Sequence, residues 1–203
     1  MPMNTTTSLH NNEIRDHILA TGQRIMAGKG FSAVGLNEIL KDAGVPKGSF
    51  YHYFGSKEAF GVDMLSHYFD DYLADIDRTL GQPGLTMAQR LMNYFQQWQA
   101  SQSFSDCQGK CLAVKLGAEV ADLSDSMRKA LDAGTSGIIS RLSEALETGV
   151  TEGSLAIDEP PRTVAESLYQ LWLGASVMVK IVRHTGPFDS AMITTRKIIH
   201  ITP

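Results

Sequence analysis

The residues best suited to contact a charged partner lie between Val45 and Phe60, in the segment VPKGSFYHYFGSKEAF. Two aromatic residues, Phe50 and Phe54, are four positions apart and would share one face of a short helix, where they can anchor it to a core. The opposite face then presents hydrogen-bond donors, which suit phosphate groups and the edges of bases. These outward donors are Lys47, Ser49, Tyr51 and His52.

The segment before these donors has the pattern of a helix followed by a turn. Apolar residues at helical spacing predict a helix over 36–43, with Gly35 at its cap and the carboxylate of Glu38 placed to reach back to the cap amide. Gly44 can supply the left-handed backbone of a turn, and residues 47–53 then form a second short helix. Residues 36–54 are therefore predicted to form a helix-turn-helix, behind a first helix that begins near Asn11 or Asn12.

Four short motifs in this region resemble the amino-terminal signature of TetR-type one-component repressors: Ala43-Gly44-Val45, Lys47-Gly48-Ser49, Tyr51-His52-Tyr53-Phe54 and Ser56-Lys57-Glu58-Ala59-Phe60. The resemblance implies that Lys47, Tyr51, His52 and Lys57 contact phosphates or base edges of DNA, within a motif that includes Gly48. The family usually has Thr where this chain has Gly35, so the hydroxyl contact to a phosphate is not expected here. Further segments at 110–116, 118–124 and 171–175 resemble an electrophile-responsive member of the family.

Composition limits the class of protein. The chain has 203 residues, of which 43% are hydrophobic, as expected of a globular protein. Residues 1–60 carry six Lys or Arg and five Asp or Glu, whereas residues 61–203 carry twelve Lys or Arg and seventeen Asp or Glu. Binding to DNA must therefore come from placed side chains and not from bulk charge. The polar start does not resemble a secretory signal, and the most apolar stretch, 168–182, is too short and too polar to span a membrane, so we expect a cytoplasmic protein.

Helical periodicity continues through the rest of the chain, which predicts an all-α fold. We expect a three-helix DNA-binding domain with a helix-turn-helix at residues 1–55 and a helical ligand-sensing and dimerisation domain at residues 56–203. Ser56 and Ser124 are predicted to cap helices. The predicted helices of the second domain cover residues 56–80, 86–102, 125–148, 161–183 and 188–201, with another that begins near Cys111.

Cys111 is the residue best placed for covalent chemistry. The start of a helix and nearby cations, Lys110 and Lys115, would stabilise a thiolate. The alternative is that Cys111 is a small buried apolar residue and that Lys115 pairs with Glu119 one turn later. The resemblance to the electrophile-responsive repressor favours the sensor interpretation.

Lys180 interrupts the most apolar helix of the chain, so its ammonium must reach solvent, pair with an acid or lose its proton easily. By resemblance, it lies where a lysine works with the sensor cysteine. We therefore expect Lys180 close to Cys111, with the alternative that it only reaches solvent. Cys107 is a second candidate thiol, available to resolve an oxidised Cys111.

Two further sets of residues are predicted from apolar patterns. A small-molecule pocket can be lined by Met64, Tyr68, Phe95, Trp98 and Trp172, although residues of this kind are more often plain core. The helix over 161–183 is apolar in nearly every direction, so we expect it to pack both on its own core and on a second copy of the chain. The expected dimer interface contains Leu171, Ala175, Val179 and Val182.

No catalytic motif or metal-binding spacing is present in the sequence, so we expect no enzyme activity, no metal and no cofactor. The predicted function is a repressor that binds a palindromic operator in double-stranded DNA as a homodimer and is released by an electrophile or oxidant acting on a cysteine. The alternatives are the same repressor induced by a non-covalent small ligand, a helical enzyme with a cryptic site, and a constitutive architectural DNA-binding protein.

Overall fold

The computed structural model describes residues 5–102 and 111–201. All regular structure in these two ranges is helical. The helices are α1 (Thr5–Lys29), α2 (Leu36–Ala43), α3 (Lys47–Tyr53), α4 (Lys57–Leu80), α5 (Met87–Gln102), α7 (Leu112–Leu123), α8 (Asp125–Thr151), α9 (Pro161–Val182) and α10 (Gly186–Ile198). The predicted all-α fold is therefore confirmed over the described residues.

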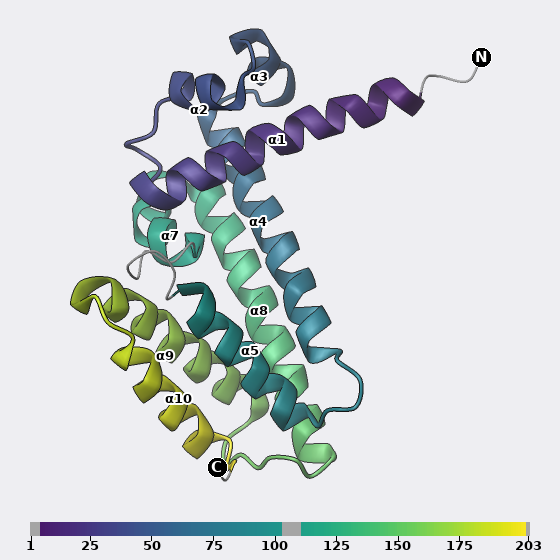
Figure 1. The fold of residues 1–203 in the computed structure, drawn as a ribbon, viewed down its shortest axis with the longest axis vertical. Helices are drawn as coiled ribbons and strands as arrows, with labels where there is room; N and C mark the ends of the chain where they lie inside the picture. The colour runs from purple at the N-terminus through teal and green to yellow at the C-terminus, as the bar shows by residue number, and fades with distance from the viewer. Residues whose placement is uncertain (1–4, 103–110, 202–203) are drawn as a thin grey trace.

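Two long helices, α4 and α8, pack against each other along the centre of the molecule (Figure 1). Helices α1, α2 and α3 lie at one end of this pair, and the amino-terminal half of α1 projects away from the body (Figure 1). Helices α5 and α9 pack on α8 towards the other end, α10 packs on α9, and α7 lies between α1 and the α9 and α10 pair (Figure 1). This arrangement places α7 against both halves of the molecule.

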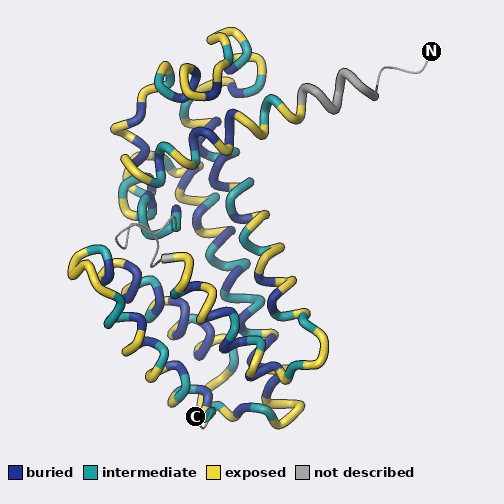
Figure 2. The backbone as a smooth tube through the Cα atoms, viewed as in Figure 1, coloured by how far each residue is buried: buried dark blue, intermediate teal, exposed yellow. Residues whose placement is uncertain are grey.

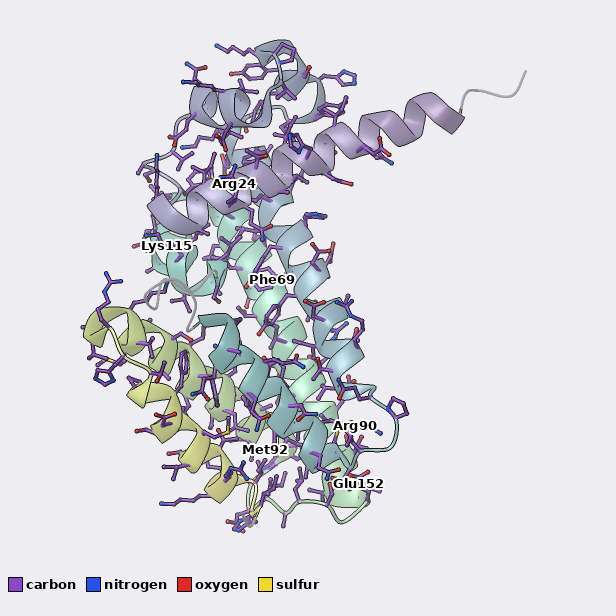
Figure 3. All side chains as sticks on the ribbon, viewed as in Figure 1. Arg24, Phe69, Arg90, Met92, Lys115 and Glu152 are labelled. Atoms are coloured by element: carbon purple, nitrogen blue, oxygen red, sulfur yellow. The ribbon has the colours of Figure 1, made fainter. Side chains whose placement is uncertain are left out.

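The core follows the inner faces of these helices, as the buried segments in Figure 2 show. Helices α4 and α8 approach closely because Gly134 of α8 faces the ring of Phe69, which is labelled in Figure 3. A Cβ atom at position 134 would lie 2.1 Å from that ring. Near the end of the helix pair that carries α1, α2 and α3, Gly61 leaves similar room for Phe31 and Met127. The contact between α4 and α8 is therefore tight along much of its length.

Local signals in the sequence correctly predicted several helix ends. Ser56 accepts a hydrogen bond from the amide of Ala59 at 3.0 Å, and Ser124 accepts one from Met127 at 3.2 Å, so both predicted caps are confirmed. The prediction for Glu38 was wrong, because its carboxylate bonds Lys29 at the end of α1 instead of the cap amide of α2. Helix α1 begins at Thr5, earlier than expected, and α10 covers 186–198, two to three residues ahead of the predicted 188–201.

The described helices include none that is both long enough and apolar enough to cross a lipid bilayer. Within the described ranges, no three His, Cys, Asp or Glu side chains are grouped so that they could hold a metal ion.

Candidate DNA-binding and sensor sites

The turn between α2 and α3 has the predicted geometry. Gly44 has φ 65° and ψ 28°, the left-handed conformation that glycine adopts with little strain, and its amide contacts the last carbonyls of α2. The amide of Val45 donates to the carbonyl of Leu40 at 3.1 Å. These bonds end α2 and direct the chain into α3, so the sequence folds into a helix-turn-helix here.

Helix α3 is fixed to the body by aromatic packing. Phe50, Phe54 and Phe60 are almost completely buried, and their ring centroids lie 5.0 to 5.4 Å apart. Each ring therefore contacts the other two, which gives this seven-residue helix an anchor that its own backbone bonds could not provide. The predicted anchoring role of Phe50 and Phe54 is confirmed.

The opposite face of α3 is open to solvent. Tyr51 is 52% exposed, Lys47, Gly48 and His52 are also exposed, and Ser49 is half-buried. The ammonium of Lys47 lies 6.0 Å from the centre of the Tyr51 ring. These side chains form a surface of donors and a cation on one short helix, which is the chemistry that phosphates and base edges accept.

Lys57 lies apart from that surface. Its ammonium donates to the carbonyl of Phe31 at 2.8 Å and lies 4.5 Å from the centre of the Phe31 ring. Burial lowers the pKa of Lys57, while the nearby carboxylate of Glu119 partly offsets this shift. Lys57 therefore holds the loop after α1 in this structure, and its contact with DNA stays a prediction.

The thiol of Cys111 lies directly before α7, at the cap position of that helix. The phenol of Tyr68 on α4 donates to the sulfur at 3.7 Å. Burial raises the pKa of Cys111, whereas the amides of Val114 and Ala113, the Tyr68 hydroxyl and the positive charge of Lys180 lower it without cancelling the effect of burial. The helix start and a cation do favour the thiolate, as predicted, but burial outweighs them, so the resting form is a thiol.

Lys180 on α9 lies within electrostatic range of this sulfur. Burial lowers the pKa of Lys180, the charges of Lys115 and Arg183 lower it further, and the sulfur of Cys111 raises it. A lowered pKa gives the amine a larger neutral, nucleophilic fraction than an exposed lysine has. Of the other residues predicted near the thiol, Lys115 is described, whereas Lys110 and Cys107 lie outside the described residues.

The hydroxyl of Tyr68 contacts the thiol, and three further tyrosines lie within electrostatic range of it, namely Tyr72, Tyr94 and Tyr169. Tyr68 and Tyr72 stack with ring centroids 5.9 Å apart, and the hydroxyl of Tyr72 lies 3.3 Å from that of Tyr94 on α5. Burial raises the pKa of Tyr68, Tyr94 and Tyr169, and the nearby sulfur of Cys111 raises each further. Of these tyrosines, only Tyr68 was singled out from the sequence, as a pocket residue.

The predicted pocket residues are mostly packed against one another. The Trp172 ring is fully buried and stacks on Phe95 with centroids 4.9 Å apart, and its indole N–H donates to Thr195 at 2.9 Å. Met64 is fully buried as well. Trp98 instead lines an open pocket of about 130 Å³ between α4 and α5, together with Tyr72, Tyr94, Thr79 and Gln97.

Helix α9 is apolar on two sides, as its sequence indicates. Ala175 and Val179 are buried inside the protomer, at 7% and 1% exposure, and this corrects the expectation that both face a partner. Leu171 packs partly against the core, and Val182 is 37% exposed. The apolar surface left open is formed by Val177, Met178, Ile181 and Val182 of α9 and Ile193 of α10.

Comparison with known proteins agrees with this geometry. Residues 18–60 match the model of bacterial regulatory proteins, tetR family, and residues 88–195 match the tetracyclin repressor-like C-terminal domain. The chain belongs to the TetR family. It is 43% identical over 187 residues to the transcriptional repressor NemR of Escherichia coli strain K12, covering 92% of this chain and 94% of that protein.

A second relative in the TetR family is the transcriptional repressor DhaR of Mycobacterium sp. strain GP1, 34% identical over 176 residues and covering 87% of each chain. Among solved structures, the reduced form of E. coli NemR matches with a TM-score of 0.89 at 44% identity, covering 94% of this chain and 98% of that one. The TetR-family chain is therefore a DNA-binding transcriptional regulator of the helix-turn-helix class, and both named relatives are regulators, not enzymes.

Two carboxylates of this TetR-family chain join segments far apart in sequence, one linking α7 to the loop after α1 and the other linking the start of α4 to the start of α8, and sequence reasoning missed both contacts. Glu119 of α7 accepts hydrogen bonds from the amides of Phe31 and Ser32, at 3.0 and 2.7 Å. Glu58, at the start of α4, accepts from the hydroxyls of Ser124 and Ser126. The partners are more than sixty residues apart in sequence, so no local pattern could have identified them.

Proposed function

We propose that this chain is a homodimeric repressor that leaves its operator when an electrophile or oxidant modifies Cys111. The observation that carries the proposal is the position of this thiol, immediately before the helix that contacts the DNA-binding end, with a phenol 3.7 Å away and Lys180 in range. In this proposal residues 1–55 bind DNA and residues 56–203 sense the inducer and dimerise.

The environment of Cys111 suits a thiol that is quiet at rest and reactive when an electrophile arrives. Burial keeps most of the thiol protonated, which protects it from indiscriminate oxidation. When the thiolate forms, its sulfur adds to an electron-poor carbon of a quinone or maleimide. A C–S bond forms, the C=C electron pair moves towards the carbonyl oxygen, and a proton from solvent completes the adduct.

Lys180 extends this chemistry to oxidants. Hypochlorous acid transfers chlorine to sulfur and releases water, with the thiol proton taken up by the departing hydroxide. The neutral amine of Lys180 then attacks the sulfur, chloride leaves, and an S–N bond forms as the amine loses a proton. The lowered pKa of Lys180 supports this role because a larger fraction of the amine carries a free electron pair. Cys107 remains the alternative resolving thiol. One solved structure similar to this chain is that of the reduced form of E. coli NemR.

The dimer that this function requires needs an apolar surface exposed on each protomer. We propose that α9 and α10 meet their copies through Val177, Met178, Ile181 and Ile193, which are 44%, 45%, 67% and 57% exposed. The two α3 helices must then lie about 34 Å apart to enter successive major grooves. Lys47, Gly48, Ser49, Tyr51, His52 and Lys57 are the proposed contacts to phosphates and bases. Modification of the thiol would change this spacing and weaken operator binding. A coupling free energy of about 1–3 kcal/mol between the two events lowers operator affinity roughly 5- to 150-fold.

The test is a gel shift with the DNA upstream of the chain's own gene, with and without a quinone. Wild-type protein and Cys107→Ser should bind and be released, whereas Cys111→Ser should bind and stay bound. Release of Cys111→Ser together with retention of Cys107→Ser would assign the role to the other cysteine. Release of all three would contradict covalent sensing.

One observation favours a second candidate function, induction by a non-covalent ligand. The pocket of about 130 Å³ between α4 and α5 is lined by the phenols of Tyr72 and Tyr94 and by Trp98, groups that bind small planar molecules. Under this candidate, a ligand without electrophilic carbon would release all three proteins equally in the same gel shift.

A further inference from the structure

Glu119 makes the most direct contact between the sensor half and the DNA-binding helices. Its two carboxylate oxygens each accept one backbone amide, Oε2 from Phe31 at 3.0 Å and Oε1 from Ser32 at 2.7 Å. Both amides belong to the loop that joins α1 to α2. Burial alone would raise the pKa of Glu119. The N–H groups of Ser32 and Phe31, the Ser32 hydroxyl and the charge of Lys115 together outweigh burial. The pKa of Glu119 is therefore below its usual value, and the carboxylate is ionised at neutral pH.

The loop is built to fit this carboxylate. Gly30 ends α1 with φ 93°, and a Cβ atom at that position would lie 2.9 Å from Oε2 of Glu119. Lys57 binds the other side of the same loop, through the Phe31 carbonyl at 2.8 Å, and is attracted by Glu119. Phe31 is therefore held at its amide by α7 and at its carbonyl and ring by the start of α4.

Cys111, the thiol of the proposed function, immediately precedes the same helix. Glu119 follows Cys111 by eight residues, about 12 Å along an α-helix. The transmission we infer treats α7 as a rigid body, so that a displacement of its first turn is carried to Glu119. The last turn of α7 is also joined to α4, because Glu58 bonds Ser124 and Ser126 just beyond it. Figure 3 shows Lys115, midway between Cys111 and Glu119, next to the carboxyl-terminal end of α1.

We propose that Glu119 is a positioning residue that transmits the state of Cys111 to the DNA-binding helices by holding the Phe31–Ser32 amides. This inference rests on the proposed function in that it takes Cys111 as the sensor. The pairing of Lys115 with Glu119 along the helix does not account for the geometry, because both oxygens are directed to main-chain donors 87 and 88 residues away in sequence.

The test compares Glu119→Gln and Glu119→Asp with the wild type in full-length protein. Glutamine keeps the length but offers one acceptor oxygen, whereas aspartate keeps both oxygens on a shorter stem. Asp122→Asn is the matched control, since Asp122 is an exposed acidic residue on the same helix. For each protein, N-ethylmaleimide labelling of Cys111 is followed by mass spectrometry, and operator Kd is measured before and after labelling.

We expect all variants to label at the wild-type rate, because Glu119 lies two turns from the thiol. The ratio of labelled to unlabelled Kd should be roughly 5 to 150 in wild type and Asp122→Asn, and should fall below about 2 in Glu119→Gln, with Glu119→Asp in between. Hydrogen exchange at the Phe31 and Ser32 amides should become faster in unlabelled Glu119→Gln than in unlabelled wild type. Equal exchange rates are expected if Glu119 does not hold these two amides.

Two results overturn different statements. If the wild type responds to labelling and Glu119→Gln responds equally, the role of Glu119 is refuted while the sensor remains. If the wild-type Kd does not change on complete labelling of Cys111, the proposed function fails and the transmission by Glu119 fails with it. If Glu119→Gln does not fold, Glu119→Asp takes its place in the test. Its ratio of labelled to unlabelled Kd must then be lower than the ratio of the wild type.

Discussion

Removing the Tyr68 hydroxyl tests the proposed role of the Cys111 thiol at the hydrogen bond that this phenol donates to the sulfur. The phenol lies 3.7 Å from the Cys111 sulfur and stabilises the thiolate over the thiol. A hydrogen bond to a charged group contributes about 1.5–3 kcal/mol. Since about 1.4 kcal/mol is a factor of ten in an equilibrium constant, Tyr68→Phe should raise the pKa of Cys111 and lower its thiolate fraction at neutral pH roughly 10- to 100-fold.

The thiolate is the reacting form, so alkylation at neutral pH should slow roughly 10- to 100-fold in Tyr68→Phe. The assay is the rate of labelling by N-ethylmaleimide between pH 6 and 10, followed by mass spectrometry of the Cys111 peptide. The rate rises with pH until the thiol is ionised, and the whole profile should move to higher pH in the variant. At high pH the two proteins should reach similar rates, because the intrinsic nucleophilicity of the thiolate changes little.

Tyr72→Phe is the matched control, one turn later on α4, with its hydroxyl next to Tyr94 and not next to the sulfur. Its labelling profile should stay close to that of the wild type. The reasoning is refuted if the Tyr68→Phe profile superimposes on the wild type, or if Tyr72→Phe shifts it by the same amount, since a general change in packing would then explain both.

Three further predictions follow from other parts of the structure. Lys47→Ala should weaken binding to all operator sequences alike and lower the slope of log Kd against log salt by about one per protomer, and an unchanged slope would remove Lys47 from the phosphate contacts. Ile181→Glu should leave the protomer folded but abolish the dimer, whereas Val179→Asp should unfold the protomer, with sedimentation and circular dichroism as the two measurements. The free energy of unfolding should fall above about pH 10, by about 1.4 kcal/mol per pH unit for each buried tyrosine. The reason is that the pKa values of Tyr68 and Tyr94 are raised only in the folded state, so the unfolded chain loses those protons first. Equal denaturant midpoints at pH 8 and 10.5 would contradict this prediction.

Local signals explain what the sequence could predict. Gly44, the Phe50 and Phe54 pair and the caps at Ser56 and Ser124 act within a few residues, so spacing alone indicates the helix-turn-helix and the helix starts. The all-α fold follows from periodicity in the same way. Such features can be identified before any tertiary contact is known.

The remainder depended on tertiary contacts. Helix α9 is apolar on nearly all sides, so its sequence could not say that Val179 faces inward while Ile181 faces outward. The pKa of Cys111 depends on burial, which a sequence does not display, and the helix start therefore suggested a stronger thiolate than the structure supports. The contacts of Glu119 and Lys57 with the loop after α1 join distant segments and required the folded chain.

The most direct measurement of the central claim uses Cys107→Ser, in which Cys111 is the only cysteine left, since the chain has two. Operator Kd is measured by fluorescence anisotropy before and after one equivalent of N-ethylmaleimide, with labelling confirmed by mass spectrometry. We predict complete labelling of Cys111 and an increase in Kd of roughly 5- to 150-fold. A fully labelled protein that binds its operator with unchanged Kd would contradict the claim that this thiol controls DNA binding.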